Sequence, residues 1–271
     1  MTARRLAILV LAASALTACS SHTEAPPDPK AQLIASTASL RTGNYTYTAT
    51  MPNVQISGVA HLPSHSASRT RKYTYRPGLN LYEVRLIGND EFTRSQVDAT
   101  WLAAERKDLQ EATGGTTTKT LNDALHGGTE TVVEPERWQQ LDLSRISART
   151  LAMRLTLTDP DQTGATLLLS GIQTATRSGA TITGTLDPTK PSIQVTAFEP
   201  AQPQATAPVT YAATLDDQGR LTRLVIDLPE AQKSQRPAGQ WTLEIANYGT
   251  ATPQTAPTDF DRTPEANYQF M

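Results

Sequence analysis

A period-two alternation of apolar and polar residues, broken at intervals by turn signals, limits what this chain can fold into more than any other feature. Residues 44–51 alternate in this way, and Pro52-Asn53 separates them from a second alternating run at 54–62. Successive side chains of a strand point to opposite faces of a sheet, so the pattern predicts a β-hairpin. Further strands are expected at 71–76, 79–87, 91–94, 180–186, 209–215, 221–228 and 241–248.

Two helices are expected beside these strands. Asp28 is a favourable N-cap for a helix over residues 30–42, which Gly43 would end. Residues 165–178 contain a run of leucines and an isoleucine and are followed by Gly179, which predicts a second helix. Both helices have an apolar stripe that needs a surface to pack on.

Strands in runs, with helices grouped between them, predict an α+β fold in which helices pack on the concave face of a curved antiparallel sheet, a half-barrel. Residues 143–157 fit a helix or a strand equally well, and the pattern is weakest between 98 and 146. We expect one domain over residues 30–253, followed by a Pro-rich polar tail at 254–271.

The N-terminus has the layout of a lipoprotein signal peptide. Arg4-Arg5 precede an apolar run over residues 6–16, and small residues follow. The run is about a dozen residues, whereas a membrane-spanning helix needs roughly 20. Residues 1–18 are therefore expected to be removed, and the small, polar residues 19–29 to form a flexible tether.

Leu16-Thr17-Ala18-Cys19 resembles the bacterial lipobox, in which the cysteine thiol receives diacylglycerol. Cys19 is the only cysteine in the chain, and exported proteins rarely keep an unpaired reactive thiol. The alternative is an ordinary secretory signal that contains a chance cysteine. We expect Cys19 to carry acyl chains such as palmitate and to anchor the protein to the outer face of the cytoplasmic membrane.

Composition and motifs argue against several classes of function. The formal net charge is −2 and the pI is about 6.1, so there is no basic field that would attract nucleic acid. Neither a nucleophile elbow nor a phosphate-binding loop nor a zinc-protease motif occurs. His61 and His65 would share a metal only on a helix, and Pro63 argues against one there. No enzyme activity, cofactor or metal is therefore expected.

Other charged and aromatic groups admit two interpretations each. Asp159 with Asp161, and Asp216 with Asp217, lie in turns, where capping is favoured over paired-carboxylate catalysis. Basic residues of the first strands form either an anionic-lipid contact or solvated strand faces; they are Arg69, Arg71, Lys72, Arg76, Arg85, Arg94 and Arg106. Tyrosines of the same strands line a ligand cavity or belong to the core; they are Tyr45, Tyr47, Tyr73, Tyr75 and Tyr82.

Several segments, in this order, resemble the mycobacterial LppX/LprAFG lipoprotein family and, more widely, the LolA-like periplasmic carriers. They are the lipobox and the segments 33–62, 138–144, 159–168, 183–187, 211–228 and 247–249. The resemblance covers most of the chain beyond the signal peptide. It implies a half-barrel wrapped over helices, with a hydrophobic cavity that takes acyl chains, and a role in binding or transferring lipid or lipoglycan in the cell envelope.

Two hypotheses of function follow. In the first, a monomeric, membrane-anchored carrier binds a lipid or glycolipid between sheet and helices. Its expected ligand-binding residues are Met51, Ile56, Val84, Leu86, Leu168, Ile172 and Val225. In the second, the same fold has a filled core and acts as a non-catalytic scaffold or sensor. The volume between sheet and helices separates the two, because packed cores have few voids.

The lipobox generates the first testable prediction. Replacing the acceptor thiol, Cys19→Ala, is expected to move the protein from the membrane fraction into the medium, or to leave an unprocessed precursor. Stable anchoring needs two acyl chains or more, because each buried methylene contributes only about 0.8 kcal/mol. Cell fractionation and mass measurement check this outcome. A Cys19→Ala protein that stays in the membrane at its mature mass contradicts the assignment.

Overall fold

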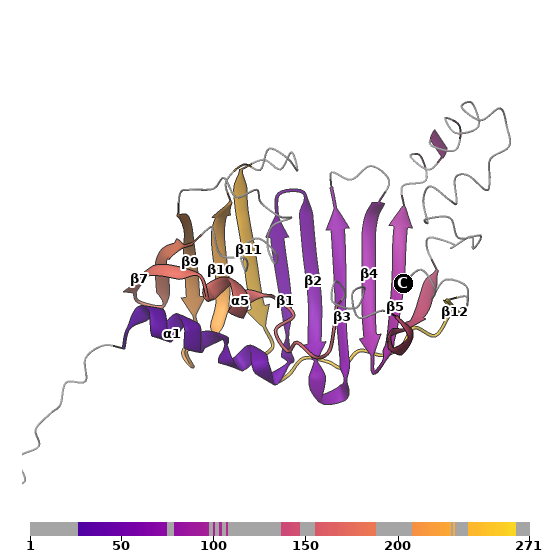
Figure 1. Ribbon diagram of the computed structural model, residues 1–271, viewed down its shortest axis with the longest axis horizontal. Helices are drawn as coiled ribbons and strands as arrows, with labels where there is room; N and C mark the ends of the chain where they lie inside the picture. The colour runs from indigo at the N-terminus through magenta and orange to yellow at the C-terminus, as the bar shows by residue number, and fades with distance from the viewer. Residues whose placement is uncertain are drawn as a thin grey trace, which may run out of the picture.

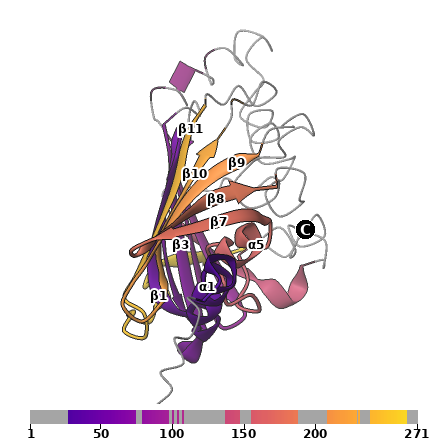
Figure 2. The same cartoon turned by 90° about the vertical axis from the view of Figure 1, so that its left-hand side faces the viewer.

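One large sheet dominates the computed structural model, which describes residues 27–74, 79–97, 100, 103–104, 107, 137–146, 155–187, 208–228, 230 and 238–263. Within these residues, twelve strands form an open, curved sheet (Figures 1 and 2). Their order in space is β12-β6-β5-β4-β3-β2-β1-β11-β10-β9-β8-β7. Neighbours are antiparallel, except that β12 pairs with β6 in parallel. The expected curved antiparallel sheet is thereby confirmed.

The alternating pattern located most of these strands. Four expected ranges, 44–51, 79–87, 209–215 and 221–228, agree with the structure residue for residue. Two short strands, β6 and β12, were not predicted, and the expected signal peptide at 1–18 lies outside the described residues. The strands are β1 Asn44–Met51, β2 Val54–His61, β3 Ser66–Tyr73, β4 Leu79–Ile87, β5 Asp90–Val97, β6 Trp138–Asp142, β7 Ile172–Ser178, β8 Thr181–Leu186, β9 Val209–Leu215, β10 Leu221–Leu228, β11 Gly239–Ala246 and β12 Phe260–Arg262.

The first expected helix forms as α1 (Pro29–Ser36) and continues as a 3-10 helix, η1 (Thr37–Thr42). Asp28 caps it, because its carboxylate accepts hydrogen bonds from two backbone N–H groups of the first turn, at 3.3 and 3.2 Å. Gly43 ends it with φ 58°, a conformation that favours glycine. Two further short 3-10 helices are η2 (Leu62–Ser64) and η3 (Leu143–Arg145).

The expectation of a second helix over 165–178 is wrong beyond its first turns. Helix α5 spans only Ala165–Leu169, and strand β7 begins at Ile172. Residues 173–178 are mostly polar, and the β-branched Thr174 and Thr176 favour strand geometry. Pairing with β8, reinforced by a hydroxyl contact of 2.9 Å between Thr174 and Thr185, decides the conformation. Among the described residues, no helix has the length and apolarity to cross a bilayer.

The alternation gives the sheet two faces. The inner face is defined here as the one that carries Tyr45, Tyr47 and Ala49; their cross-strand partners on β2 and β11 lie on the same face. Leucines of α1, η1 and α5 join these residues and strands β7–β11 in a first core, and Figure 1 shows α1 and α5 over this part of the sheet. Fully buried members of the first core include Leu33, Leu40, Leu168, Ile182, Leu224 and Leu243.

A smaller second core lies on the inner face of β3 and β4. Ala67, Val84 and Leu86 are buried there against Leu155, which comes from the irregular segment before α5. The half-buried Tyr82 packs against the same cluster. Segment 155–164 thus covers the inner face beyond the reach of α1 and α5.

The expected polar tail at 254–271 contributes to the sheet through residues 254–263. After β11 the chain follows the lower strand ends to β12 (Figure 1). On the way the backbone N–H of Ala251 donates to Asn44 Oδ1 and that of Gln254 to Ser66 Oγ, each at 3.0 Å. Phe260 then stacks edge-on against Phe92, with ring centroids 5.1 Å apart. Contacts between residues far apart in the sequence determine the position of β12, and no local sequence pattern predicts them.

Two adjacent leucines of α5 provide the second testable prediction. Leu168 is 0% exposed and Leu167 is 47% exposed. Leu168→Ala is therefore expected to lower the free energy of unfolding by about 2 to 5 kcal/mol, because it removes apolar burial and leaves a cavity. The matched control Leu167→Ala should change it by less than about 0.5 kcal/mol. Urea unfolding of both variants measures the difference, and equal effects contradict the packing described.

Candidate functional site

The structure does not bring the seven expected ligand-binding residues together. Leu168 and Ile172 belong to the first core, with Met51 and Ile56 half-buried at its margin. Val84 and Leu86 belong to the second core. Val225 points away from both, because its neighbours Leu224 and Ile226 occupy the inward positions of β10. The sequence did not show which residues of β10 point to the inner face, and Val225 was therefore assigned to the wrong face.

The space between α5 and the sheet, where the carrier hypothesis places its ligand, is filled at Leu168. This side chain and Leu169, at 0% and 1% exposed, are surrounded by members of the first core. A fully buried leucine in a continuous cluster occupies the space that an acyl chain would need. The α5 side of the inner face is therefore core.

Between the two cores, the inner face of β2–β4 carries a mixed row of side chains. Cross-strand register aligns Ile56 of β2, Arg71 of β3 and Tyr82 of β4. We call these three residues the Arg71 row. All three are half-buried, in contrast to the leucines of the first core. The row combines apolar, cationic and aromatic surface, and is the candidate ligand-binding surface.

The neighbouring row is held by polar contacts. Gly58 of β2 has no side chain, and a Cβ there would lie 2.3 Å from Cζ of Tyr47, so the tyrosine ring can lie across β2. Its hydroxyl accepts a hydrogen bond of 3.3 Å from Arg69 Nε. Arg69 Nη2 donates to the backbone oxygen of Gln162 at 3.4 Å. Arg69 thus connects the sheet to segment 155–164.

Tyr45, which is fully buried, also holds segment 155–164. Its hydroxyl donates to the backbone oxygen of Pro160 and accepts from the backbone N–H of Gln162, each at 2.8 Å. Burial raises the pKa of Tyr45 far above its usual value, and the nearby Asp161 carboxylate raises it further. The phenol therefore stays protonated and serves as a fixed donor and acceptor.

The acid pairs hold turns, as capping predicts. Asp161 accepts hydrogen bonds from the backbone N–H groups of Thr163, Gly164 and Thr166, at 3.0, 3.1 and 2.7 Å. These donors lie at the start of α5, where helix N–H groups lack partners within the helix. Asp159 in turn accepts from the N–H of Asp161 at 2.9 Å.

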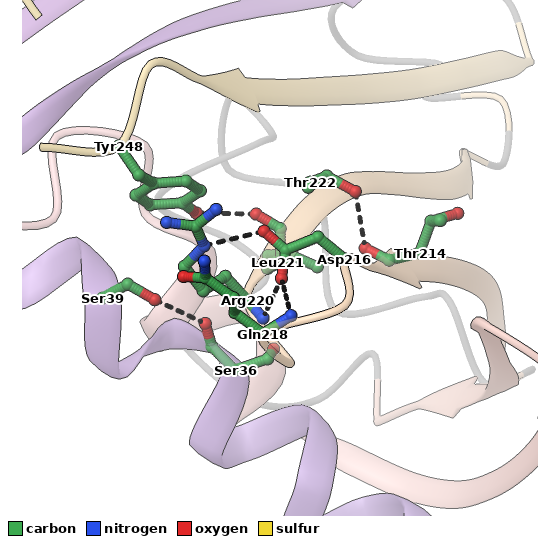
Figure 3. A network of polar contacts seen from close by, with 9 residues as sticks. All are labelled: Ser36, Ser39, Thr214, Asp216, Gln218, Arg220, Leu221, Thr222 and Tyr248. Atoms are coloured by element: carbon green, nitrogen blue, oxygen red, sulfur yellow. Dashed lines mark hydrogen bonds and ion pairs between the residues drawn. The ribbon is translucent and has the colours of Figure 1, made fainter. Parts of the chain in front are cut away.

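Asp216 has a comparable role in the β9–β10 hairpin (Figure 3). Its carboxylate accepts from the backbone N–H groups of Gln218 and Arg220 at 3.0 and 2.8 Å, and from Arg220 Nε at 2.7 Å. The Arg220 guanidinium lies 4.9 Å from the ring centroid of Tyr248, whose hydroxyl donates to the Leu221 backbone oxygen. This network joins the hairpin to the turn after β11.

A pocket of about 700 Å³ lies between α1 and the β7–β8 and β9–β10 turns. Gln32 and Arg177 border it and contact each other, with 2.5 Å between Oε1 and Nη1. Much of the remaining lining is turn residues, including Asp217 and Gln218.

The basic residues of the first strands do not form one strip. Arg69 and Arg71 lie on the inner face, whereas Arg85 and Arg94 lie on the outer face and stack on the Trp138 ring, 4.7 and 4.8 Å from its centroid. Arg94 also forms an ion pair with Glu83. Arg69 and Arg71 are therefore on the opposite side of the sheet from Arg85 and Arg94, because successive residues of a strand point to opposite faces. Lys72 lies on the outer face as well. The other two members named above, Arg76 and Arg106, lie outside the described residues, as does Tyr75.

The histidines lie in a turn. His61 ends β2, and its Nδ1 is 2.7 Å from the hydroxyl of Ser64. His65 follows η2 with φ 50°. Among the described residues, no three histidine, cysteine or acidic side chains are grouped closely enough to hold a metal ion.

A scan against protein-family models found no match, and a search of curated proteins found no relative of this chain.

The Asp216 network generates the third testable prediction. Burial raises the pKa of Asp216, but hydrogen bonds from Arg220 and Gln218 and the charge of Arg220 outweigh it and lower the pKa below its usual value. A lowered folded-state pKa stabilises the fold above the unfolded-state value, near 3.9, and this contribution is lost as pH falls through the folded-state pKa.

Asp216→Asn is therefore expected to destabilise the protein at about pH 7 by about 1 to 3 kcal/mol, because charge-assisted hydrogen bonds are lost. The difference from the wild type should shrink as the pH falls below about 4. Thermal melts across this range measure it, with Asp217→Asn at the exposed neighbouring position as the control. A gap that is constant across pH contradicts the assigned role.

Proposed function

We propose that this chain is a membrane-anchored, extracytoplasmic lipoprotein of the LppX/LprAFG type that binds a hydrophobic ligand on the inner face of its sheet. The anchor is the lipid on Cys19. Helices α1, η1 and α5 close one part of the concave side with packed core. The ligand lies beside that core, over the Arg71 row, and the protein carries it to or within the cell envelope.

The contrast between filled and half-buried surface on the inner face carries this proposal. Under the helices the leucines are fully buried, whereas Met51 and Ile56 at the margin of the first core are only half-buried. Tyr82 is half-buried at the margin of the second core. Apolar side chains at this position gain free energy when a further apolar group covers them, about 25 cal/mol for each Å² removed from water.

The polar groups also favour binding over catalysis. Asp159, Asp161 and Asp216 accept the backbone hydrogen bonds of turns, and Tyr45 is held protonated between two backbone groups. Side chains committed to backbone groups in this way hold the turns in a defined position. They are not disposed as a nucleophile with its base.

The second candidate function is a scaffold or sensor with a filled core. Burial of Leu168 and Leu169, at 0% and 1% exposed, between α5 and the sheet favours it. The same sheet would then present its surfaces to a protein partner at the membrane.

A binding measurement on the full chain carrying Cys19→Ala forms the fourth testable prediction. The delipidated protein is expected to bind hexadecanol in native mass spectrometry and in a fluorescent-probe displacement assay. Ile56→Trp, which fills space beside Arg71, should weaken binding by about tenfold or more, equivalent to about 1.4 kcal/mol, while melting stays within a few degrees.

Leu167→Trp adds the same bulk at an exposed position of α5 and should leave binding unchanged. If the delipidated wild type binds no long-chain ligand, the carrier function is refuted and the scaffold function stands.

A further inference from the structure

We propose that Arg71 recognises an anionic headgroup, so that the ligand of this protein is an acidic amphiphile: an acyl chain that ends in a carboxylate or a phosphate. This inference rests on the proposed ligand-binding function and specifies its chemistry. It concerns the inner face of β2–β4 and not the pocket beside α1.

The position of Arg71 follows from strand register. In β3 it pairs with Ile56 on one side and with Tyr82 on the other. Directly opposed residues of antiparallel strands share a face, with Cβ atoms about 4.5 to 5.5 Å apart. Arg69, two residues earlier, lies on the same face, and Lys72, the next residue, lies on the opposite one. The guanidinium therefore belongs to a surface whose nearest strand neighbours are an isoleucine and a tyrosine.

Arg71 also lacks the contacts that its counterparts make. Within the described part of the chain it is half-buried, yet its side chain has no hydrogen bond, ion pair or ring contact. The other half-buried arginines there all have partners: Arg69 with Tyr47 and Gln162, Arg85 with Thr255 and Trp138, Arg94 with Glu83 and Trp138, and Arg220 with Asp216 and Tyr248. The guanidinium of Arg71 alone among them retains its full set of donors for a ligand.

A guanidinium beside apolar groups selects for an anion. Removing part of its hydration is costly unless an opposite charge and hydrogen-bond acceptors replace it. Carboxylates and phosphates match its planar fork of donors and form paired, charge-assisted hydrogen bonds. An amphiphile whose chain covers Ile56 and Met51, and whose headgroup meets Arg71, satisfies both parts of the surface. A neutral chain of the same length satisfies only the apolar part.

The fifth testable prediction compares ligands that differ only in the headgroup. On the full chain carrying Cys19→Ala, the wild-type inner face should bind palmitate and lysophosphatidate about tenfold or more tightly than hexadecanol. Arg71→Gln should remove this preference, weakening binding of the two anionic ligands about tenfold while hexadecanol changes less than about twofold. Arg71→Lys, which keeps the charge but not the fork, should restore part of the preference.

Lys72→Gln is the matched control, because it removes the same charge from the adjacent, exposed residue of the outer face. It should leave all affinities unchanged, and melting curves of the four proteins should coincide within a few degrees. Inorganic phosphate is the further probe and should not compete with palmitate at millimolar concentration, because it has no chain to cover the apolar part.

The outcomes separate the two proposals. Equal binding of palmitate and hexadecanol by the wild type, or a preference that survives Arg71→Gln, overturns the role of Arg71 and leaves the carrier function intact. Competition by inorganic phosphate overturns the assignment to an amphiphile. Failure of every long-chain probe to bind the wild type refutes the carrier function itself, and the role of Arg71 with it.

Discussion

The pairing of β1 with β11 is the interaction on which the rest of the molecule depends. It is the junction between the first group of strands, β1–β6, and the second, β7–β11, in a single sheet. The junction connects residues about 200 positions apart, and side chains of Thr46 and Asn247 reinforce it. Its register sets Tyr47 opposite Ile245 and Ala49 opposite Leu243, so both groups of strands present their apolar residues to one core. A shift of one residue would turn every side chain of one group to the wrong face.

The inner face that results has two different parts. Where the helices lie, leucines from α1, η1 and α5 are buried against the sheet, and this packing supplies stability. Farther along the sheet, segment 155–164 takes over the covering role, held by Tyr45, Asp161 and Arg69. Buried hydrogen bonds to a fixed phenol and a capped carboxylate hold that segment in a defined position. The half-buried Arg71 row borders the first core at Ile56 and the second core at Tyr82, and we propose it as the binding surface for a ligand with both apolar and anionic groups.

Which residues belong to the candidate site depends on the face of the sheet to which each side chain points. The alternating sequence pattern predicts that face for some strands only. The pattern correctly placed Ile56 and Met51 on one face, because β1 and β2 form a regular hairpin. It failed at Val225, since three successive apolar residues in β10 conceal which of them points inward. It also failed at Ile172, where a run of leucines extended an expected helix into a strand that pairing with β8 determines. The arginines formed one group in the sequence, and register divided them between two faces with different environments.

The sequence by itself determined the local structure: the alternation of most strands, the capped helix that starts at Asp28, the turns at Pro52-Asn53 and after Asp216, and the lipobox that predicts an anchor at Cys19. These features depend on neighbours a few residues apart, so local physics specifies them. Only the tertiary structure decided that Leu168 is buried in the first core, that residues 260–262 pair with β6, and that the Arg71 side chain, between Ile56 and Tyr82, has no partner within the described part of the chain. Each of these depends on strand pairs and packed segments far apart in the chain, and their contacts exist only once the sheet has assembled.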